Sequence, residues 1–323
     1  MSGRAEFDLI ERIKARATSR PDVVLGIGDD AALLQVPEGH VLVVSTDTLV
    51  AGVHFPADTA PQDIGWKALA VNLSDLAAMA ATPAWASLAL TLPEGDADWL
   101  DGFLDGFCEL ADEHQVALIG GDTTRGPLSI TITVHGLVPA GMALRRDGAG
   151  FNDDIWVTGT LGDAGGALSQ WRGKGLMSAK LRYRLDRPTP RIAAGIALRE
   201  LANAGIDISD GLVADLGHVL RRSGVGAELD LGRLPCSRTL ADHFSNEAER
   251  WRLQLGAGDD YELCFTAAPA NALAIEQAMA ACDTAATVIG RITREPGLRL
   301  RTPEGESFEP GSGGYQHFAG PAD

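Results

Sequence analysis

The chain has 323 residues, of which 45% are hydrophobic and 22% are charged, as in an ordinary globular protein long enough for two domains. Its formal net charge of −17, from 44 acidic and 27 basic side chains, argues against nucleic acid or an anionic membrane surface as the main partner. We expect neither a secretory signal nor a membrane span, and the four widely spaced cysteines indicate reduced thiols, which together favour a cytoplasmic protein.

The first half of the chain alternates between strand-like and helix-like segments. The β-branched residues 41–46 predict a buried strand that ends in a polar turn at residues 45–48. Strict alternation over residues 128–138 predicts a strand with one buried face. The remaining elements that we expect here are helices over residues 6–13, 61–81 and 97–115, and strands over residues 85–92 and 116–119.

A loop rich in glycine and arginine, residues 141–150, predicts the boundary between domains of residues 1–148 and 149–323. After it we expect strands over residues 154–158, 261–266 and 287–292, and helices over residues 191–203 and 212–222. The pattern is that of two halves, each α/β or α+β.

Aspartate recurs beside glycine or hydroxyl residues at the predicted strand ends and turns. Two carboxylates about 4 Å apart repel by roughly 4 kcal/mol at an effective dielectric near 20, so they converge only where something neutralises them. Mg²⁺ is the usual neutraliser and brings phosphates with it. Because the chain has only four lysines, a lysine-based phosphate site is not expected. The segments are residues 26–30, 45–48, 72–75, 120–124, 207–211 and 256–260.

Asp75 lies in a predicted helix that is otherwise apolar, three residues after Asn72 and so on the same helix face. A carboxylate there costs several kcal/mol unless it is paired. We interpret Asp75 as a metal ligand; a salt bridge to an arginine is the alternative.

Three polar segments fit a metal–phosphate site. Ser45-Thr46-Asp47 offers small oxygen ligands after a strand, although a simple polar turn is the alternative. Gly120-Gly121-Asp122 repeats this arrangement, with glycines that let backbone amides approach a phosphate. Asp207-Ile208-Ser209-Asp210 precedes a predicted helix whose first turn has free amides, and helix capping is its alternative.

Other motifs are weaker. Residues 26–31 fit the dinucleotide pattern G-x-G-x-x-A, which we reject because two carboxylates would stand where the pyrophosphate needs amides. Gly173-Lys174 is followed by glycine, so it is no Walker A loop. His54 is either structural or a ligand contact, and Arg146 is either a solvated loop residue or a contact to triphosphate oxygens.

Taken in order, these segments resemble the thiamine-monophosphate kinase family over nearly the whole chain. The matching pieces are Gly28-Asp29-Asp30-Ala31, Ser45-Thr46-Asp47-Thr48 with His54-Phe55, residues 70–75, residues 120–124, residues 207–212, Asp260-Tyr261-Glu262-Leu263 and the tail at residues 314–318. The resemblance implies the fold of the aminoimidazole ribonucleotide synthetase-like superfamily. An α/β N-terminal half would bind ATP and several Mg²⁺ ions and form a homodimer, and an α+β half would follow it.

The resemblance also implies the site residues. Magnesium ligands would be Asp30, Ser45, Thr46, Asp47, Asp75, Asp122, Asp207 and Asp210. ATP would contact Gly121, Asp122, Arg146 and Ser209, and thiamine monophosphate would contact His54, Glu262 and Tyr315. Asp259 and Asp260 would shape the turn that presents Glu262, and Asp29 has no assigned role.

The implied reaction is transfer of the γ-phosphoryl group of ATP to thiamine monophosphate, the last step of thiamine diphosphate biosynthesis. No general base is expected, because the acceptor phosphate has a second pKa near ~6 and is largely ionised at neutral pH. The alternatives are another superfamily member that activates an amide or formyl oxygen with ATP, and a nucleotide-binding protein without catalysis. A selenophosphate synthetase would need a cysteine before Cys108, and a hydrogenase-maturation protein would need one at the C-terminus; the sequence has neither.

Overall fold

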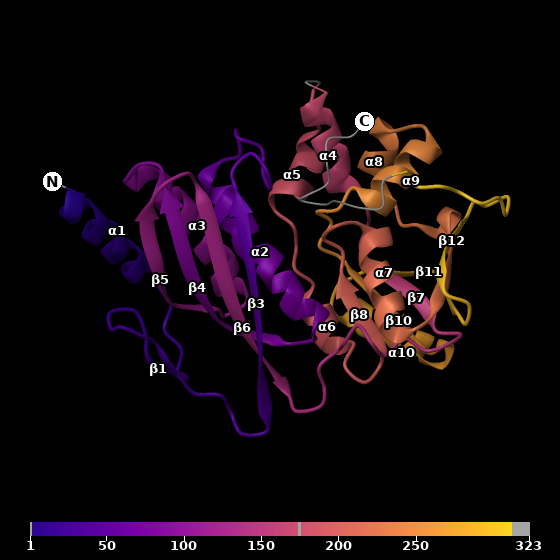
Figure 1. Cartoon of the computed structure of the whole chain (residues 1–323), viewed down its shortest axis with the longest axis horizontal. Coiled ribbons are helices and arrows are strands. Elements are labelled where there is room, and N and C mark those ends of the chain that lie inside the picture. The colour runs from indigo at the N-terminus through magenta and orange to yellow at the C-terminus, as the bar shows by residue number, and fades with distance from the viewer. Residues whose placement is uncertain (1, 174–175, 312–323) are drawn as a thin grey trace. The chain divides into compact units, whose positions relative to one another are not determined.

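The structure is a computed structural model that describes residues 2–173 and 176–311. Its contacts divide the chain into two compact units, each with a sheet and a core of its own (Figure 1). Unit 1 comprises Met1–Leu76 and Ala81–Gly141, and unit 2 comprises Ala77–Ala80 and Met142–Asp323.

Unit 1 is built on a four-stranded sheet in the order β3-β6-β4-β5. Strand β6 is antiparallel to both β3 and β4, and β5 is parallel to β4. Figure 1 shows α2 and α3 running along the sheet. The elements are α1 (Ser2–Arg16), β1 (Val23–Leu25), β2 (Leu33–Leu34), β3 (His40–Val50), α2 (Pro61–Ala78), β4 (Thr82–Leu92), α3 (Ala97–Glu113), β5 (Ala117–Arg125) and β6 (Ser129–Pro139).

The core of unit 1 lies between the sheet and these two helices. Leu69 and Leu73 of α2 and Phe103 of α3 have no exposed surface. The alternation predicted for residues 128–138 is confirmed, because Ile130, Ile132 and Val134 are fully buried while the residues between them are not. The one-sided strand follows from its alternating sequence, and α2 follows from an apolar run that is buried on nearly all sides.

Unit 2 is built on a six-stranded sheet in the order β12-β9-β11-β7-β10-β8. Neighbouring strands are antiparallel except β12 and β9, which are parallel. The elements are β7 (Asp154–Thr158), α4 (Asp163–Arg172), α5 (Ala179–Asp186), α6 (Ile192–Ala197), β8 (Ala204–Asp207), α7 (Leu212–Ser223), β9 (Gly226–Asp230), η1 (Leu231–Arg233), α8 (Arg238–His243), α9 (Glu247–Gly256), β10 (Leu263–Ala267), η2 (Pro269–Asn271), α10 (Ala272–Ala281), β11 (Ala286–Thr293) and β12 (Gly297–Arg301).

The core of unit 2 is formed by one face of this sheet and helix α7. Val157 and Ile206 from the sheet pack with Leu212 and Leu216 from the helix, and all four are buried. The predicted strand at residues 154–158 is confirmed. The helix predicted over residues 191–203 is shorter, because α6 ends at Ala197.

Two predicted turns are wrong. Residues 45–48 continue strand β3, which pairs with β6 without interruption from His40 to Val50. Residues 120–124 likewise continue β5. A strand with one face open to solvent carries polar residues along its length, so the polar residues of β3 do not mark its end.

The prediction that residues 41–46 are buried is also wrong. Strand β3 is at the edge of its sheet, and Val41, Leu42 and Val44 are 45%, 44% and 53% exposed. Beyond them the hydroxyls of Thr46 and Thr133 are 2.9 Å apart, and those of Thr48 and Thr131 are 2.8 Å apart. We call Val44, Thr46, Thr48, Thr131 and Thr133 the open sheet face. Within the described residues, no helix is long and apolar enough to span a membrane.

Candidate active site

Strand β3 and helix α2 bring Ser45, Asp47, Asn72 and Asp75 together within unit 1. Ser45 and Asp47 are two residues apart, so their side chains lie on the same face of the strand. The Ser45 hydroxyl donates a hydrogen bond to the Asp75 carboxylate, and the Asp47 amide donates one to Asn72 Oδ1 at 3.0 Å. These contacts confirm that Asn72 and Asp75 share one face of the helix.

The Asp47 and Asp75 carboxylates repel each other. Burial, and then the charge of Asp75, raise the pKa of Asp47 to about 6. A hard cation would offset both the burial and the repulsion, because it supplies the opposite charge at the point where the two carboxylates meet. Ser45, Asp47 and Asp75 offer oxygen atoms, which are the ligands that Mg²⁺ takes in proteins. These residues therefore fit a Mg²⁺ ion.

Asp30 and Gly121 line a pocket of about 420 Å³ in unit 1. Residues 26–32 form one wall, and Lys14 of α1 and Ser87 of β4 also line it. Gly121 has a φ of +153°, and a Cβ there would lie 1.7 Å from the backbone oxygen of Leu88, so strand packing alone requires glycine. Asp30, a predicted metal ligand, and Gly121, a predicted ATP contact, therefore line the same pocket.

The structure does not bring all the predicted unit 1 ligands into one cluster. Thr46 points away from Ser45 and Asp47, since it bonds to Thr133 on the open sheet face. Asp122 is exposed on β5. In the described part of the chain, no three acidic, histidine or cysteine side chains are grouped closely enough to hold a metal ion. The metal-binding roles of all these unit 1 residues stay predictions: Asp30, Ser45, Thr46, Asp47, Asp75 and Asp122.

In unit 2, Asp207 ends strand β8, and Ser209 and Asp210 follow in the loop before helix α7. Asp207 is 4% exposed and pairs with Leu263 of β10. The hydroxyl of Ser223, the last residue of α7, donates to the Arg146 carbonyl at 3.0 Å, and the Arg146 charge partly offsets the burial that raises the pKa of Asp215. Arg146 therefore lies near helix α7, which follows Ser209 and Asp210 in the chain.

Asp215 was missed by the sequence analysis. It lies in the first turn of α7, and its Oδ2 accepts hydrogen bonds from the amides of Ser209 and Asp210 at 3.0 and 3.1 Å. Burial, and then the charge of Asp210, raise its pKa to about 7. The alternative of helix capping by Asp207, Ser209 or Asp210 is not borne out, because the N-cap of α7 is Gly211 and no side chain among the described residues caps the helix. An acidic residue in the first helical turn was the available signal.

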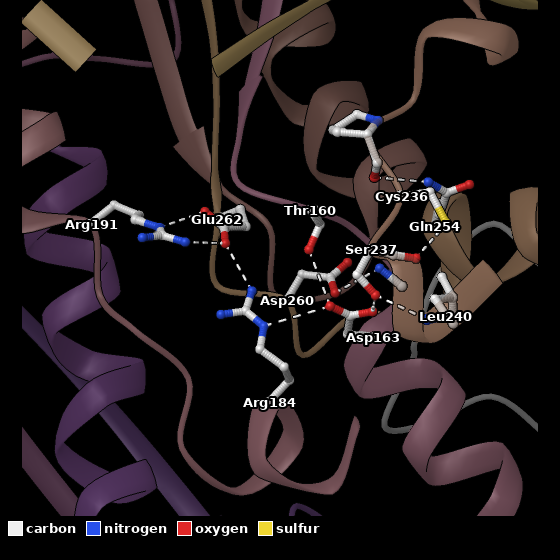
Figure 2. A network of polar contacts seen from close by, with 12 residues as sticks. Thr160, Asp163, Arg184, Arg191, Cys236, Ser237, Leu240, Gln254, Asp260 and Glu262 are labelled. Atoms are coloured by element: carbon white, nitrogen blue, oxygen red, sulfur yellow. Dashed lines mark hydrogen bonds and ion pairs between the residues drawn. The ribbon is translucent and has the colours of Figure 1, made fainter. Parts of the chain in front are cut away.

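Glu262 is the centre of a buried ion-pair cluster in unit 2, formed with Thr158, Arg184 and Arg191, which we call the Glu262 cluster. Arg191 donates to both carboxylate oxygens at 2.6 Å, and Arg184 and the Thr158 hydroxyl donate at 2.8 and 2.7 Å. Figure 2 shows Arg184 lying between Glu262 and Asp163. The Arg184 Nε atom is 3.8 Å from Asp163 Oδ2. Glu262 has no exposed surface, and its contact with thiamine monophosphate stays a prediction.

The turn before Glu262 has an unusual backbone. Asp259 and Tyr261 have positive φ angles of 60° and 49°, and the Tyr261 hydroxyl donates to Asp259 at 3.1 Å. Asp260 is buried, accepts a hydrogen bond from the Gly162 amide at 2.9 Å, and has a pKa held well above its usual value by burial. Strained backbone of this kind clusters at functional sites.

Known proteins share this architecture and sequence. Residues 28–138 match the family model "AIR synthase related protein, N-terminal domain", and residues 152–302 match the model of its C-terminal domain. The thiamine-monophosphate kinase of Escherichia coli (strain K12) is 50% identical over 98% of this chain and 99% of the relative. The chain belongs to the thiamine-monophosphate kinase family. The resemblance drawn from the ordered motifs is thereby confirmed.

Solved structures agree with this membership. The thiamine-monophosphate kinase of Stenotrophomonas maltophilia K279a has a TM-score of 0.87 and 52% identity, covering 94% of this chain and 98% of that one. A structure of AaThiL complexed with AMPPCP and TMP has a TM-score of 0.77 and 32% identity, covering 97% of both chains. The predicted two-domain fold of the aminoimidazole ribonucleotide synthetase-like superfamily is confirmed.

Two other residues of this chain, His54 and Tyr315, are predicted from the resemblance to the thiamine-monophosphate kinase family to contact thiamine monophosphate. His54 follows β3, and its Nδ1 accepts a hydrogen bond from the Val50 amide at 2.9 Å, which is a structural contact. Its contact with substrate stays a prediction. Tyr315 lies outside the described residues.

Proposed function

We propose that the protein transfers the γ-phosphoryl group of ATP to thiamine monophosphate, giving ADP and thiamine diphosphate, as the last step of thiamine diphosphate biosynthesis. The observation that carries the proposal is the 50% identity to a thiamine-monophosphate kinase over nearly the full chain. AaThiL, which binds AMPPCP and TMP in its solved complex, supports the choice of substrates.

In this reaction an oxygen of the acceptor phosphate attacks the γ-phosphorus, and the bond from that phosphorus to the β–γ bridging oxygen breaks. The acceptor needs no general base, because its second pKa lies near ~6. The barrier is the approach of one anion to another. Mg²⁺ supplies the positive charge that lowers this barrier.

The residues of the chain have proposed roles in holding the reactants. Asp30, Ser45, Thr46, Asp47, Asp75, Asp122, Asp207 and Asp210 would hold the metal ions, in domains of residues 1–148 and 149–323. The Asp47–Asp75 pair supports this assignment, since a cation would offset the burial and the repulsion that together raise the pKa of Asp47. Gly121, Asp122, Arg146 and Ser209 would bind ATP, and His54, Glu262 and Tyr315 would bind thiamine monophosphate.

We further propose that the protein forms a homodimer through the open sheet face. Val44 is 53% exposed on the edge strand β3, and neighbouring Leu42 is 44% exposed. Large apolar side chains that are exposed together on one surface mark sites of protein–protein interaction. A second copy offers the same Thr and Val side chains, as a two-fold interface requires.

An end-point assay tests the proposed reaction. The protein is incubated with Mg-ATP and thiamine monophosphate, and thiamine diphosphate and ADP are quantified by chromatography. Equal amounts of the two products support the proposal. Intact ATP, or ADP formed without thiamine diphosphate, contradicts it.

A further inference from the structure

The backbone of residues 208–210 is held on one side by the turn before Glu262. The Ile208 amide donates to the Glu262 carbonyl at 2.8 Å, and the Ile208 carbonyl accepts from the Tyr261 amide at 2.8 Å. The Ser209 carbonyl accepts from the Asp259 amide, also at 2.8 Å. Gly258 completes this contact, because a Cβ there would lie 2.4 Å from the Ser209 carbonyl oxygen.

On the other side, Asp215 holds the same segment through one carboxylate oxygen. That oxygen accepts from both the Ser209 and Asp210 amides at 3.0 and 3.1 Å, and Asp215 is only 3% exposed. The turn that contains Asp259 and Tyr261, both with positive φ angles, therefore contacts residues 208–210 on one side, while Asp215 of α7 holds them on the other.

We propose that Asp215 is a positioning residue, which presets Ser209 and Asp210 for Mg-ATP before the nucleotide arrives. The proposal rests on the proposed function, in which those two residues bind ATP and metal. Fixing the amides of two consecutive residues fixes their backbone torsions, and hence the directions in which the Ser209 hydroxyl and Asp210 carboxylate leave the chain. Without Asp215, Mg-ATP binding would have to order the loop as well as fill the site.

The test measures the dissociation constant of Mg-ATP by calorimetry, together with the Mg²⁺ concentration that half-saturates turnover. Asp215→Ala removes both hydrogen bonds, so it should raise both quantities about tenfold or more. Asp215→Asn keeps an acceptor oxygen without its charge, so it should have a smaller effect in the same direction. If Asp215→Ala does not fold, Asp215→Asn decides alone, and an unchanged dissociation constant overturns the proposal.

Asp153→Asn is the matched control. Asp153 is also buried in unit 2 and accepts a backbone amide, from Gly150 at 2.8 Å, but it bonds to Asn203 and Thr266 instead of the 208–210 segment. This variant should lose thermal stability and bind Mg-ATP normally. An equal loss of affinity in Asp153→Asn and the Asp215 variants would mean that general destabilisation is the cause, and would overturn the proposal.

A double variant tests whether Asp215 contributes to Mg-ATP binding through Asp210 or independently of it. Because part of the effect of Asp215 passes through Asp210, Asp215→Ala should weaken Mg-ATP binding less in an Asp210→Asn background than in the wild type. Fully additive effects would overturn the proposal. The binding measurement does not require turnover, so wild-type protein that binds Mg-ATP but makes no thiamine diphosphate would contradict the proposed function alone.

Discussion

The carboxylate of Asp75 on helix α2 lies close enough to Asp47 on strand β3 to add to the effect of burial in raising the pKa of Asp47 to about 6. The fold forces this proximity, because Ser45 bonds to Asp75 and the Asp47 amide bonds to Asn72. Two like charges held together in a folded protein reduce its stability and create affinity for a cation.

The first prediction concerns stability against pH. The folded-state pKa of Asp47 is above its unfolded value of 3.8, so its protonated form favours folding below about pH 4, and this contribution is lost as the pH rises through about 6. Asp47→Asn should therefore raise the free energy of unfolding at pH 8 by roughly 1–3 kcal/mol without Mg²⁺. The gain should vanish near pH 4.

Urea unfolding at both pH values measures this effect. Asp101→Asn is the control, because Asp101 forms an ion pair with Arg12 in which both side chains are more than 40% exposed. It should change stability by less than about 1 kcal/mol at pH 8. A destabilised Asp47→Asn at pH 8 would show that the repulsion between the two carboxylates does not outweigh the favourable contacts of Asp47.

The second prediction concerns metal binding. Mg²⁺ should raise the melting temperature of the wild type at pH 8, because it binds the folded carboxylate pair. Asp47→Asn should lose most of this rise, since one carboxylate is gone. Calorimetry across a Mg²⁺ titration measures it, and Asp101→Asn should respond like the wild type. An undiminished response in Asp47→Asn would remove Asp47 from the metal ligands.

The third prediction concerns turnover. Asp75→Asn and Asp122→Asn should each reduce kcat about 100-fold or more, because metal-based charge stabilisation amounts to several kcal/mol. Circular dichroism should show the fold intact in both. Asp105→Asn, which removes a surface partner of Arg16, serves as the control and should retain turnover. Near-normal activity in both variants would contradict the metal assignment.

The fourth prediction concerns the Glu262 cluster. Glu262→Gln should lower the free energy of unfolding by about 3–5 kcal/mol, because it leaves the charges of Arg184 and Arg191 without their buried partner. Glu295→Gln is the control: this exposed residue pairs with Arg299 at 3.0 Å and should change stability by less than about 1 kcal/mol. Similar losses in the two variants would show that the cluster adds little stability.

The fifth prediction concerns the open sheet face. Thr133→Arg places a like charge at the centre of the proposed two-fold interface, so sedimentation should detect monomers where the wild type forms dimers. Leu273→Arg changes an exposed apolar residue of α10 and should leave the dimer intact. A monomeric wild type at micromolar concentration would refute the proposed homodimer.

The sequence predicted the elements whose periodicity reflects burial. Helix α2 and strand β6 each have one pattern over many residues, and both were identified. The continuation of β3 through Ser45–Thr48 was missed because its threonines pair with those of β6, far away in the sequence. A polar run reads as a turn when its partner strand is unknown.

The candidate site was predictable only in part, for a related reason. Local motifs indicated Asp47, Asp75, Ser209 and Asp210 as candidates, because each stands in a short and unusual context, and their roles stay predictions. The partners that define their environment come from elsewhere. Arg191 meets Glu262 across 71 residues, and Thr158 meets it across 104. Such pairs depend on the sheet order of unit 2, which no local pattern encodes.

Phosphorus NMR of the complete reaction is the most direct test of the proposed activity. Wild-type protein is mixed with Mg-ATP and thiamine monophosphate, and unphosphorylated thiamine replaces the acceptor in a parallel sample. We expect one thiamine diphosphate for each ADP in the first sample and no reaction in the second. Intact ATP, or orthophosphate in place of the new diphosphate signals, would contradict the proposed activity.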